Sequence, residues 1–143
     1  MVISCIVAGT DGSPTAHIAL RHAVSLASDL GARLHLVAAA PRMPAWVVAE
    51  PSAAVAASEA CAGAEQDLRD SLDRTARDLR ADGLRVTTHI ATGEPADVIV
   101  SEAEQVGADL IVIGNRGVRR LTGGVPRRVS RQASCSVLIV RTT

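Results

Sequence analysis

Glycines flank one loop near the end of the chain, and their spacing points to phosphate binding. Gly114 and Gly117 follow an apolar run that has the character of a buried strand. Gly123 and Gly124 precede a short helical segment with Pro126 in its first turn. Glycine lets the backbone approach a ligand closely, and the free N–H groups at a helix start attract anions. The arrangement predicts an anion pocket built from backbone amides.

The basic residues are concentrated beside this loop, and all fifteen are arginine because the chain has no lysine. Residues 110–143 hold seven arginines and no acidic residue, whereas residues 1–109 hold eight arginines and fifteen acidic residues. Either some of these arginines pair with phosphate oxygens, or the segment is a solvated basic face. The candidates are Arg116, Arg119, Arg120, Arg127, Arg128 and Arg131.

Two common nucleotide motifs are absent from the sequence. A Walker A loop requires a lysine, and Gly9-Thr10-Asp11-Gly12 lacks the GxGxxG spacing of a dinucleotide fingerprint. Asp11 allows two interpretations. Its carboxylate accepts ribose hydroxyls or holds a metal-bound water, or it is a turn residue that bonds its own backbone.

The sequence shows no catalytic constellation. No serine lies in a GxSxG elbow, and the four histidines lack metal-ligand spacing. The three cysteines have no paired spacing, which is typical of a reducing compartment. We therefore predict no catalytic residue and at most a slow ATPase.

The composition also disfavours two classes of binding partner, nucleic acids and membranes. Trp46 is the single aromatic residue, so base-stacking nucleic-acid binding is disfavoured. Trp46 is either a hydrophobic plug or a cover over a bound base. Neither a signal segment nor an apolar run long enough to cross a bilayer is present. The expected protein is cytoplasmic and binds neither nucleic acid nor membrane.

The elements that must position these residues alternate along the chain. Helices are expected at 14–30, from about 58 to 81, after Pro95, and around Val125 to Ala133. Ser13 is expected to cap the first of them and Gly31 to end it. Prolines predict an irregular loop over 41–57. The expected strands cover residues 3–9, 34–40, 84–91, 110–113 and 137–140.

Alternation of this kind predicts one α/β domain over residues 1–143. Right-handed crossovers produce a parallel five-stranded sheet between two helical layers, a three-layer α/β/α architecture. Ligands of such sheets bind beyond the carboxyl ends of the strands, where the winding reverses.

The order and spacing of several segments resemble the universal stress protein family along essentially the whole chain. The resemblance implies a flavodoxin-like nucleotide-binding fold with strand order 3-2-1-4-5. The segments are Val7 to Ser13, Leu34 to Val37, Gly93 to Ile99, Ala108 to Gly114 and Cys135 to Arg141.

The family's phosphate motif, G-x2-G, nine residues, then G-S or G-T, can be aligned here in two ways. If nine residues are counted from Gly117, Arg127 and Arg128 take the positions of the motif's final G-S or G-T pair. If the loop is four residues shorter than in the family, Gly123 and Gly124 take those positions and Val125 follows them. We prefer this second alignment because Pro126 then falls in the first helical turn. Gly124 lacks the hydroxyl that would bond a phosphate, and Arg116, Arg119 or Arg120 could compensate.

By the preferred alignment, the resemblance implies three kinds of contact. Asp11 lies on the ribose and metal side, with Mg²⁺ held through water, and the backbone of Ala39 meets the adenine. The remaining contacts are Ile113, Gly114, Arg116, Gly117, Gly123, Gly124 and Val125.

The implied protein is a stress-response regulator that binds ATP or a smaller adenine nucleotide, with or without Mg²⁺. It is expected to form a homodimer through its last strand, Val137 to Val140. Two alternatives stay open: an interaction module with the same fold and dimer but an empty nucleotide site, and a slow ATPase.

Overall fold

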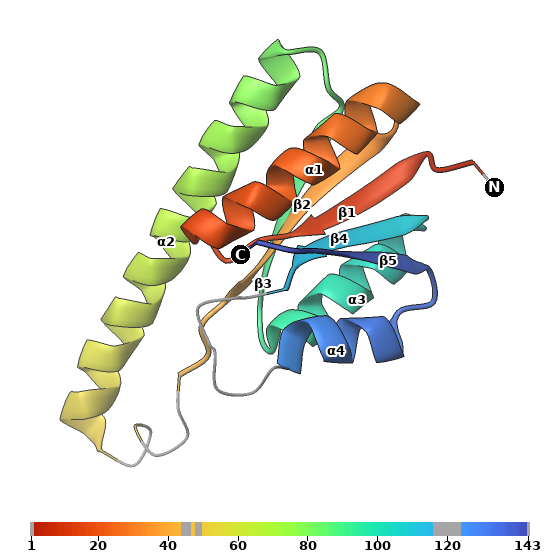
Figure 1. Cartoon of the computed structure of the whole chain (residues 1–143). Helices are drawn as coiled ribbons and strands as arrows, with labels where there is room; N and C mark the ends of the chain where they lie inside the picture. Colours follow the sequence, from red (N-terminus) through yellow and green to blue (C-terminus); the bar gives the residue numbers. More distant parts are fainter. Residues whose placement is uncertain (1, 44–46, 48–49, 116–123, 143) are drawn as a thin grey trace.

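A computed structural model describes residues 2–43, 47, 50–115 and 124–142, and strands and helices alternate through it (Figure 1). The strands are β1 (Cys5–Gly9), β2 (Arg33–Ala40), β3 (Val86–Thr92), β4 (Leu110–Gly114) and β5 (Ser136–Val140). The helices are α1 (Pro14–Leu30), α2 (Pro51–Ala81), α3 (Pro95–Val106) and α4 (Gly124–Gln132).

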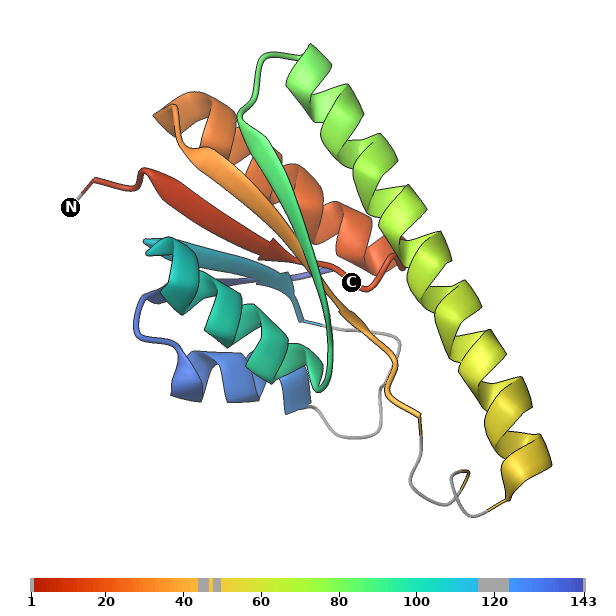
Figure 2. The same cartoon turned by 180° about the vertical axis from the view of Figure 1, so that it is seen from behind.

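The five strands form one parallel sheet with the order β3-β2-β1-β4-β5. This confirms the expected flavodoxin-like order. β3 lies along one edge beside β2 (Figure 2), and β5 forms the other edge. The winding reverses at β1, because the chain first builds outward to β2 and β3 and then returns to β4 and β5.

Each face of the sheet has its own apolar core. Even-numbered residues of β1 and β2, such as Ile6 and Leu36, pack with α1 and the second half of α2. Odd-numbered residues, such as Val7 and Val37, pack with α3 and α4. This alternation is the period of two that a strand imposes when helices cover both faces.

Local signals set the limits of α1. The Ser13 hydroxyl oxygen accepts a hydrogen bond from the Ala16 N–H at 3.2 Å, Pro14 occupies the first turn, and Gly31 follows with a φ of 64°. These are the expected cap and stop.

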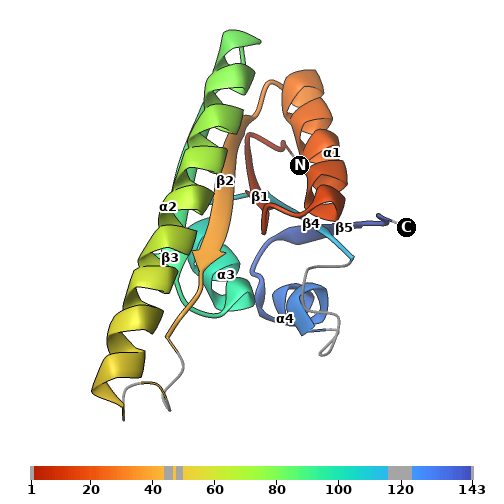
Figure 3. The ribbon, with the colours of Figure 1, turned by 90° about the vertical axis from the view of Figure 1, so that its left-hand side faces the viewer.

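Several expected limits were wrong. β1 begins at Cys5 rather than residue 3, β3 begins at Val86 rather than residue 84, and the loop expected over 41–57 is helical from residue 51. α2 begins at Pro51 rather than near 58, because proline suits the first helical turn and the alanine-rich segment after it favours helix. The first turns of α2 therefore extend beyond the end of β2 (Figure 3). Gly124 is the first residue of α4 rather than a residue before it.

Candidate functional site

β1 pairs with β2 on one side and with β4 on the other, and the two pairings end at different residues. Pairing of β1 with β2 continues to Gly9 and Val37, and pairing of β4 with β5 continues to Gly114 and Val140. Pairing of β1 with β4 ends earlier, at Ala8 and Val112. The two strands thus part at the point where the winding reverses, which is where open α/β sheets bind ligands.

Asp11 lies in the turn that leaves β1 on this edge. Its Oδ1 accepts a hydrogen bond from the Ser13 N–H at 2.9 Å, and its side chain is exposed. Gly12 has a φ of 77°, a left-handed conformation that favours glycine. The backbone contact expected of a turn residue is therefore present, and it holds the carboxylate beside the start of α1, while the contact of Asp11 with ribose or metal stays a prediction.

On the other side of the gap, β4 ends at Ile113 and Gly114. Ile113 is buried, so a contact of this residue with a ligand would have to come from its backbone rather than its side chain. Asn115, which follows, donates its N–H to the Val140 carbonyl oxygen at 2.9 Å. Its side-chain oxygen accepts hydrogen bonds from Thr142. These bonds fix the direction in which the chain leaves β4.

α4 follows with Gly124 and Val125 both half-buried, and Val125 packs against the core between the sheet and α3. Arg128 contacts acidic side chains at the start of α3: Asp97 at 3.2 Å and Glu94 at 3.7 Å. These contacts link α4 to α3. Arg128 is thus already paired, so the first of the two alignments, which puts it on the phosphate, has less support.

β2 and β3 complete the edge on the far side of β1. Ala39 is half-buried near the end of β2, and the neighbouring Ala40 carbonyl accepts the Gly93 N–H at 3.4 Å. Arg42 follows β2, and its Nη2 lies 3.4 Å from where a Cβ on Gly93 would be. Arg42 was not among the residues expected at this edge from the sequence.

Six of the nine expected contact residues lie in the described part of the chain, and all six are at this edge of the sheet. They are Asp11, Ala39, Ile113, Gly114, Gly124 and Val125. Arg116, Gly117 and Gly123 lie outside the described residues, as do Arg119, Arg120 and Trp46. Convergence of the loop amides on one pocket stays a prediction.

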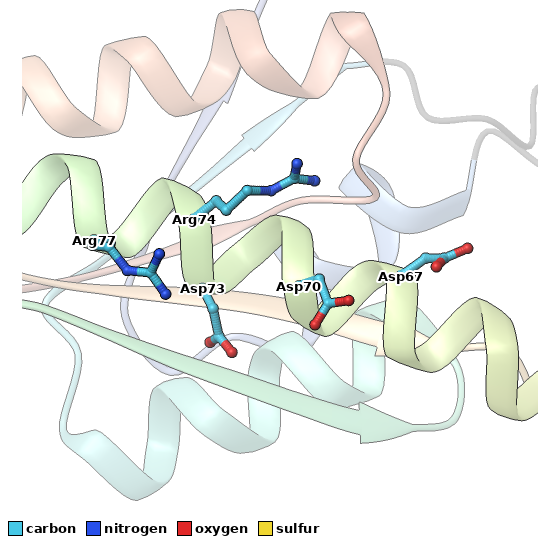
Figure 4. Close-up of a pocket in the computed structure, with 5 residues that line it drawn as sticks. All are labelled: Asp67, Asp70, Asp73, Arg74 and Arg77. Atoms are coloured by element: carbon cyan, nitrogen blue, oxygen red, sulfur yellow. The ribbon is translucent and has the colours of Figure 1, made fainter.

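A hollow of about 500 Å³ lies elsewhere, along α2, lined by Asp67, Asp70, Asp73, Arg74 and Arg77. One helix supplies all five side chains, and Arg74 points to the opposite side of the helix from Asp73 and Arg77 (Figure 4). Asp70 already accepts a hydrogen bond from Gln66, and Asp73 accepts one from Thr88. This surface is therefore not a candidate site for the nucleotide.

The described residues contain no cluster of three histidine, cysteine or acidic side chains placed to hold a metal ion. Cys5 and Cys135 are free thiols, and burial is the main cause that raises the pKa of each. Raised values keep both in the unreactive thiol form at neutral pH. No helix in the part of the chain that the structure describes is long and apolar enough to span a membrane.

Known proteins are similar to this chain in sequence and architecture. The family model described as universal stress protein family matches residues 4–141. The universal stress protein Rv1636 of Mycobacterium tuberculosis is 34% identical over 149 residues, covering 96% of this chain and 96% of that protein.

Two similar solved structures are complexes with an adenine nucleotide. A universal stress protein in complex with cAMP is 30% identical, with a TM-score of 0.68 over 100% of both chains. The universal stress protein of Archaeoglobus fulgidus in complex with dAMP is 26% identical, with a TM-score of 0.65. That match covers 97% of this chain and 98% of the other.

Proposed function

Because the chain belongs to the universal stress protein family, we propose that it binds an adenine nucleotide, ATP or a smaller relative, between β1 and β4. The early end of the β1–β4 pairing at Ala8 and Val112 is the observation that carries this proposal. The proposed site lies at the sheet edge between the Asp11 turn and Gly114. The cAMP and dAMP complexes of the two similar proteins support the choice of ligand class.

Each side of the opening has its own part in this proposal. On the β1 side, the Asp11 carboxylate accepts ribose hydroxyls or holds Mg²⁺ through a water molecule. On the β2 side, the Ala39 backbone meets the adenine ring. Ala39 is half-buried, and a flat ring can pack on such an edge without displacing a large side chain.

The phosphates face the start of α4. Ile113 and Gly114 offer backbone groups at the end of β4, while Gly124 and Val125 offer N–H groups of the first helical turn, which helix geometry leaves without a partner inside the helix. Arg116, Gly117 and Gly123 belong to the same proposed contact set. The dipole of α4 favours negative charge at this end, which is why phosphate rather than a neutral group is expected there.

We also propose that the protein acts as a homodimer joined through β5. β5 is an edge strand, and Leu138 and Ile139 expose 37% and 41% of their surface. An exposed apolar edge strand is prone to pair with another chain, so pairing with a second copy would cover it. In this scheme the protein acts in the cytoplasm during the stress response, and nucleotide binding regulates which partner it binds. Hydrolysis of ATP is slow at most.

An interaction module with the same fold and an empty nucleotide site is the second candidate. Two observations favour it: Gly124 brings no hydroxyl to the phosphate position, and the Arg128 guanidinium is engaged by Asp97 and Glu94. Both observations lower the number of hydrogen-bond donors that could bind the oxygens of a triphosphate. A shorter nucleotide needs fewer of them.

Two measurements on the purified protein separate these candidates. Mass spectrometry of the small molecules released on denaturation is expected to detect an adenine nucleotide. Calorimetric titration with ATP, AMP and cAMP is expected to give saturable heat for at least one of them. If no nucleotide is released and none binds at millimolar concentration, the interaction module is the correct function.

A further inference from the structure

A second hollow, of about 340 Å³ and open to solvent, lies where β2 and β3 begin. In Figure 1 the end of α2 and the start of β2 are at the top of the view, whereas β2 leaves the sheet toward the bottom. The hollow is therefore at the opposite end of the sheet from the proposed nucleotide site. Its lining is Arg33, Leu34, His35, Arg80, Leu84, Arg85, Val86 and Thr87, which includes three arginines and no acidic residue.

The three arginines come from different elements. Arg33 belongs to β2, and Arg85 directly precedes β3; each comes one residue before the paired residues Leu34 and Val86. Both line the same hollow. Arg80 reaches the same place from the end of α2. Within the described residues, no ion pair involves any of the three.

Two of the guanidinium groups are held in place by backbone carbonyls. Arg80 Nε donates to the Val86 oxygen at 2.9 Å, and Arg85 Nη2 donates to the Gly31 oxygen at 2.8 Å. Each bond uses one of the five N–H donors of an arginine and leaves the others for a ligand. Such anchoring lowers the entropy that the side chains lose when an anion binds.

Two acidic side chains that act on this region at longer range are engaged elsewhere. Asp109 accepts hydrogen bonds from the Ser4 N–H, the Ser4 hydroxyl and the Cys5 N–H. Glu102 lies 3.4 Å from Nε2 of His89. Both carboxylates interact with this region at longer range, since Asp109 is influenced by Arg33 and His35 by Glu102. Neither of them lines the hollow.

We propose that this hollow binds a phosphate group, either inorganic phosphate or the phosphate of a small metabolite. Guanidinium forks bind such oxygens in pairs, and an anion would neutralise part of the positive charge that three arginines bring to the hollow. Thr87 Oγ1 is hydrogen-bonded to Nδ1 of His35 at the wall of the hollow, which adds a polar contact. The proposal does not depend on the nucleotide site.

The pKa of His35 can report whether an anion is bound in the hollow. Burial and the charge of Arg33 lower the pKa of its imidazole, while Glu102 raises it by a smaller amount. A bound anion would counter the effect of Arg33. The pKa of His35 is therefore expected to rise when phosphate binds, and this rise can be followed through its ring protons by NMR.

The test is an NMR titration of the full chain with sodium phosphate, compared with sodium chloride at equal ionic strength. Phosphate is expected to shift the amides of Leu34, Val86 and Thr87 in a saturable way. Arg33 is the residue to change, because its side chain makes no hydrogen bond or ion pair within the described residues. Arg33→Gln is expected to weaken the affinity about tenfold, as loss of one charge-assisted hydrogen bond would.

Arg21→Gln, on the exposed surface of α1, is the matched control and is expected to leave the affinity unchanged. Glycerol 2-phosphate replaces phosphate in a second titration. Tighter binding of the ester indicates a metabolite, and tighter binding of phosphate indicates the free ion. The proposal is overturned if phosphate and chloride act alike on these amides, or if the two variants weaken binding equally.

Discussion

The side-chain oxygen of Asn115 accepts two hydrogen bonds from Thr142, from the backbone N–H at 2.9 Å and from the hydroxyl at 2.8 Å. Asn115 follows β4, and Thr142 follows β5. Thr142 is buried, at 8% exposure, so its donors have little access to water. The Asn115 side chain thus connects the segments that follow β4 and β5, beside the proposed phosphate loop.

Asn115→Ala is expected to lower the free energy of unfolding by about 1–3 kcal/mol, because it leaves two Thr142 donors without an acceptor. Urea unfolding followed by circular dichroism measures the change. Asn115→Asp keeps an acceptor oxygen and is expected to retain the stability. Unchanged unfolding of Asn115→Ala would show that the two bonds contribute nothing.

Gly9 is a position where the packing leaves no room for a side chain. An added Cβ would lie 2.6 Å from Cδ1 of Ile99 and 3.0 Å from Cγ2 of Ile113, and both side chains are buried. Gly9→Ala is expected to destabilise the protein by about 1–3 kcal/mol through overpacking.

Gly63→Ala is the control for that substitution. Gly63 is a helical residue of α2 with no atom within 4 Å of an added Cβ. Alanine there is expected to stabilise the protein by about 0.5–1 kcal/mol. Thermal unfolding of the two variants should therefore shift in opposite directions. A shift in the same direction would contradict the close packing at Gly9.

Asp109 makes stability depend on acid pH. Hydrogen bonds from Ser4, and then from Cys5, together with the charge of Arg33, hold the pKa of its carboxyl below the ordinary value of 3.8. Because the folded pKa is depressed, this stabilisation is complete above the unfolded pKa and is lost as the pH falls through the folded pKa.

Asp109→Asn is accordingly expected to be less stable than the wild type at pH 7, with the difference shrinking as the pH falls below about 4. Urea unfolding over a series of pH values measures this. Ser4→Ala removes one donor and should show a smaller effect of the same form. A difference that stays constant with pH would exclude the carboxylate as its source.

Ile139 tests the proposed dimer. Ile139→Lys places a charge on the open edge strand β5 and is expected to convert the dimer to a monomer in sedimentation velocity, with unchanged circular dichroism. Val55→Lys, at a residue of α2 with 60% exposure, is expected to leave the dimer intact. A wild-type protein that sediments as a monomer would refute the β5 interface.

The sequence predicted what local chemistry determines. Ser13, Pro14 and Gly31 set both ends of α1, since a cap and a stop act within one helical turn. Pro51 was misjudged as part of a loop, because proline both breaks helices and starts them. The strand order came from the family resemblance and is confirmed.

Contacts between distant residues could not be predicted in this way. The bonds of Asn115 join residues 27 positions apart. The pairing of Arg128 with Asp97 depends on how α3 and α4 pack together. Periodicity places each residue on a face of its element but does not say which residue of another element meets it.

Asp11 provides the most direct test of nucleotide binding between β1 and β4. Asp11→Asn keeps the side-chain oxygen that accepts the Ser13 N–H, so the turn is preserved while the charge is lost. Asp29→Asn, on the exposed surface at the end of α1, removes the same charge away from the site.

The decisive measurement is calorimetric titration of the wild type and these two variants with the adenine nucleotide that the wild type binds most tightly. Asp11→Asn is expected to weaken binding about tenfold or more, the loss of a hydrogen bond to a charged group. Asp29→Asn is expected to bind like the wild type. Equal affinities for all three proteins would contradict a nucleotide site beside Asp11.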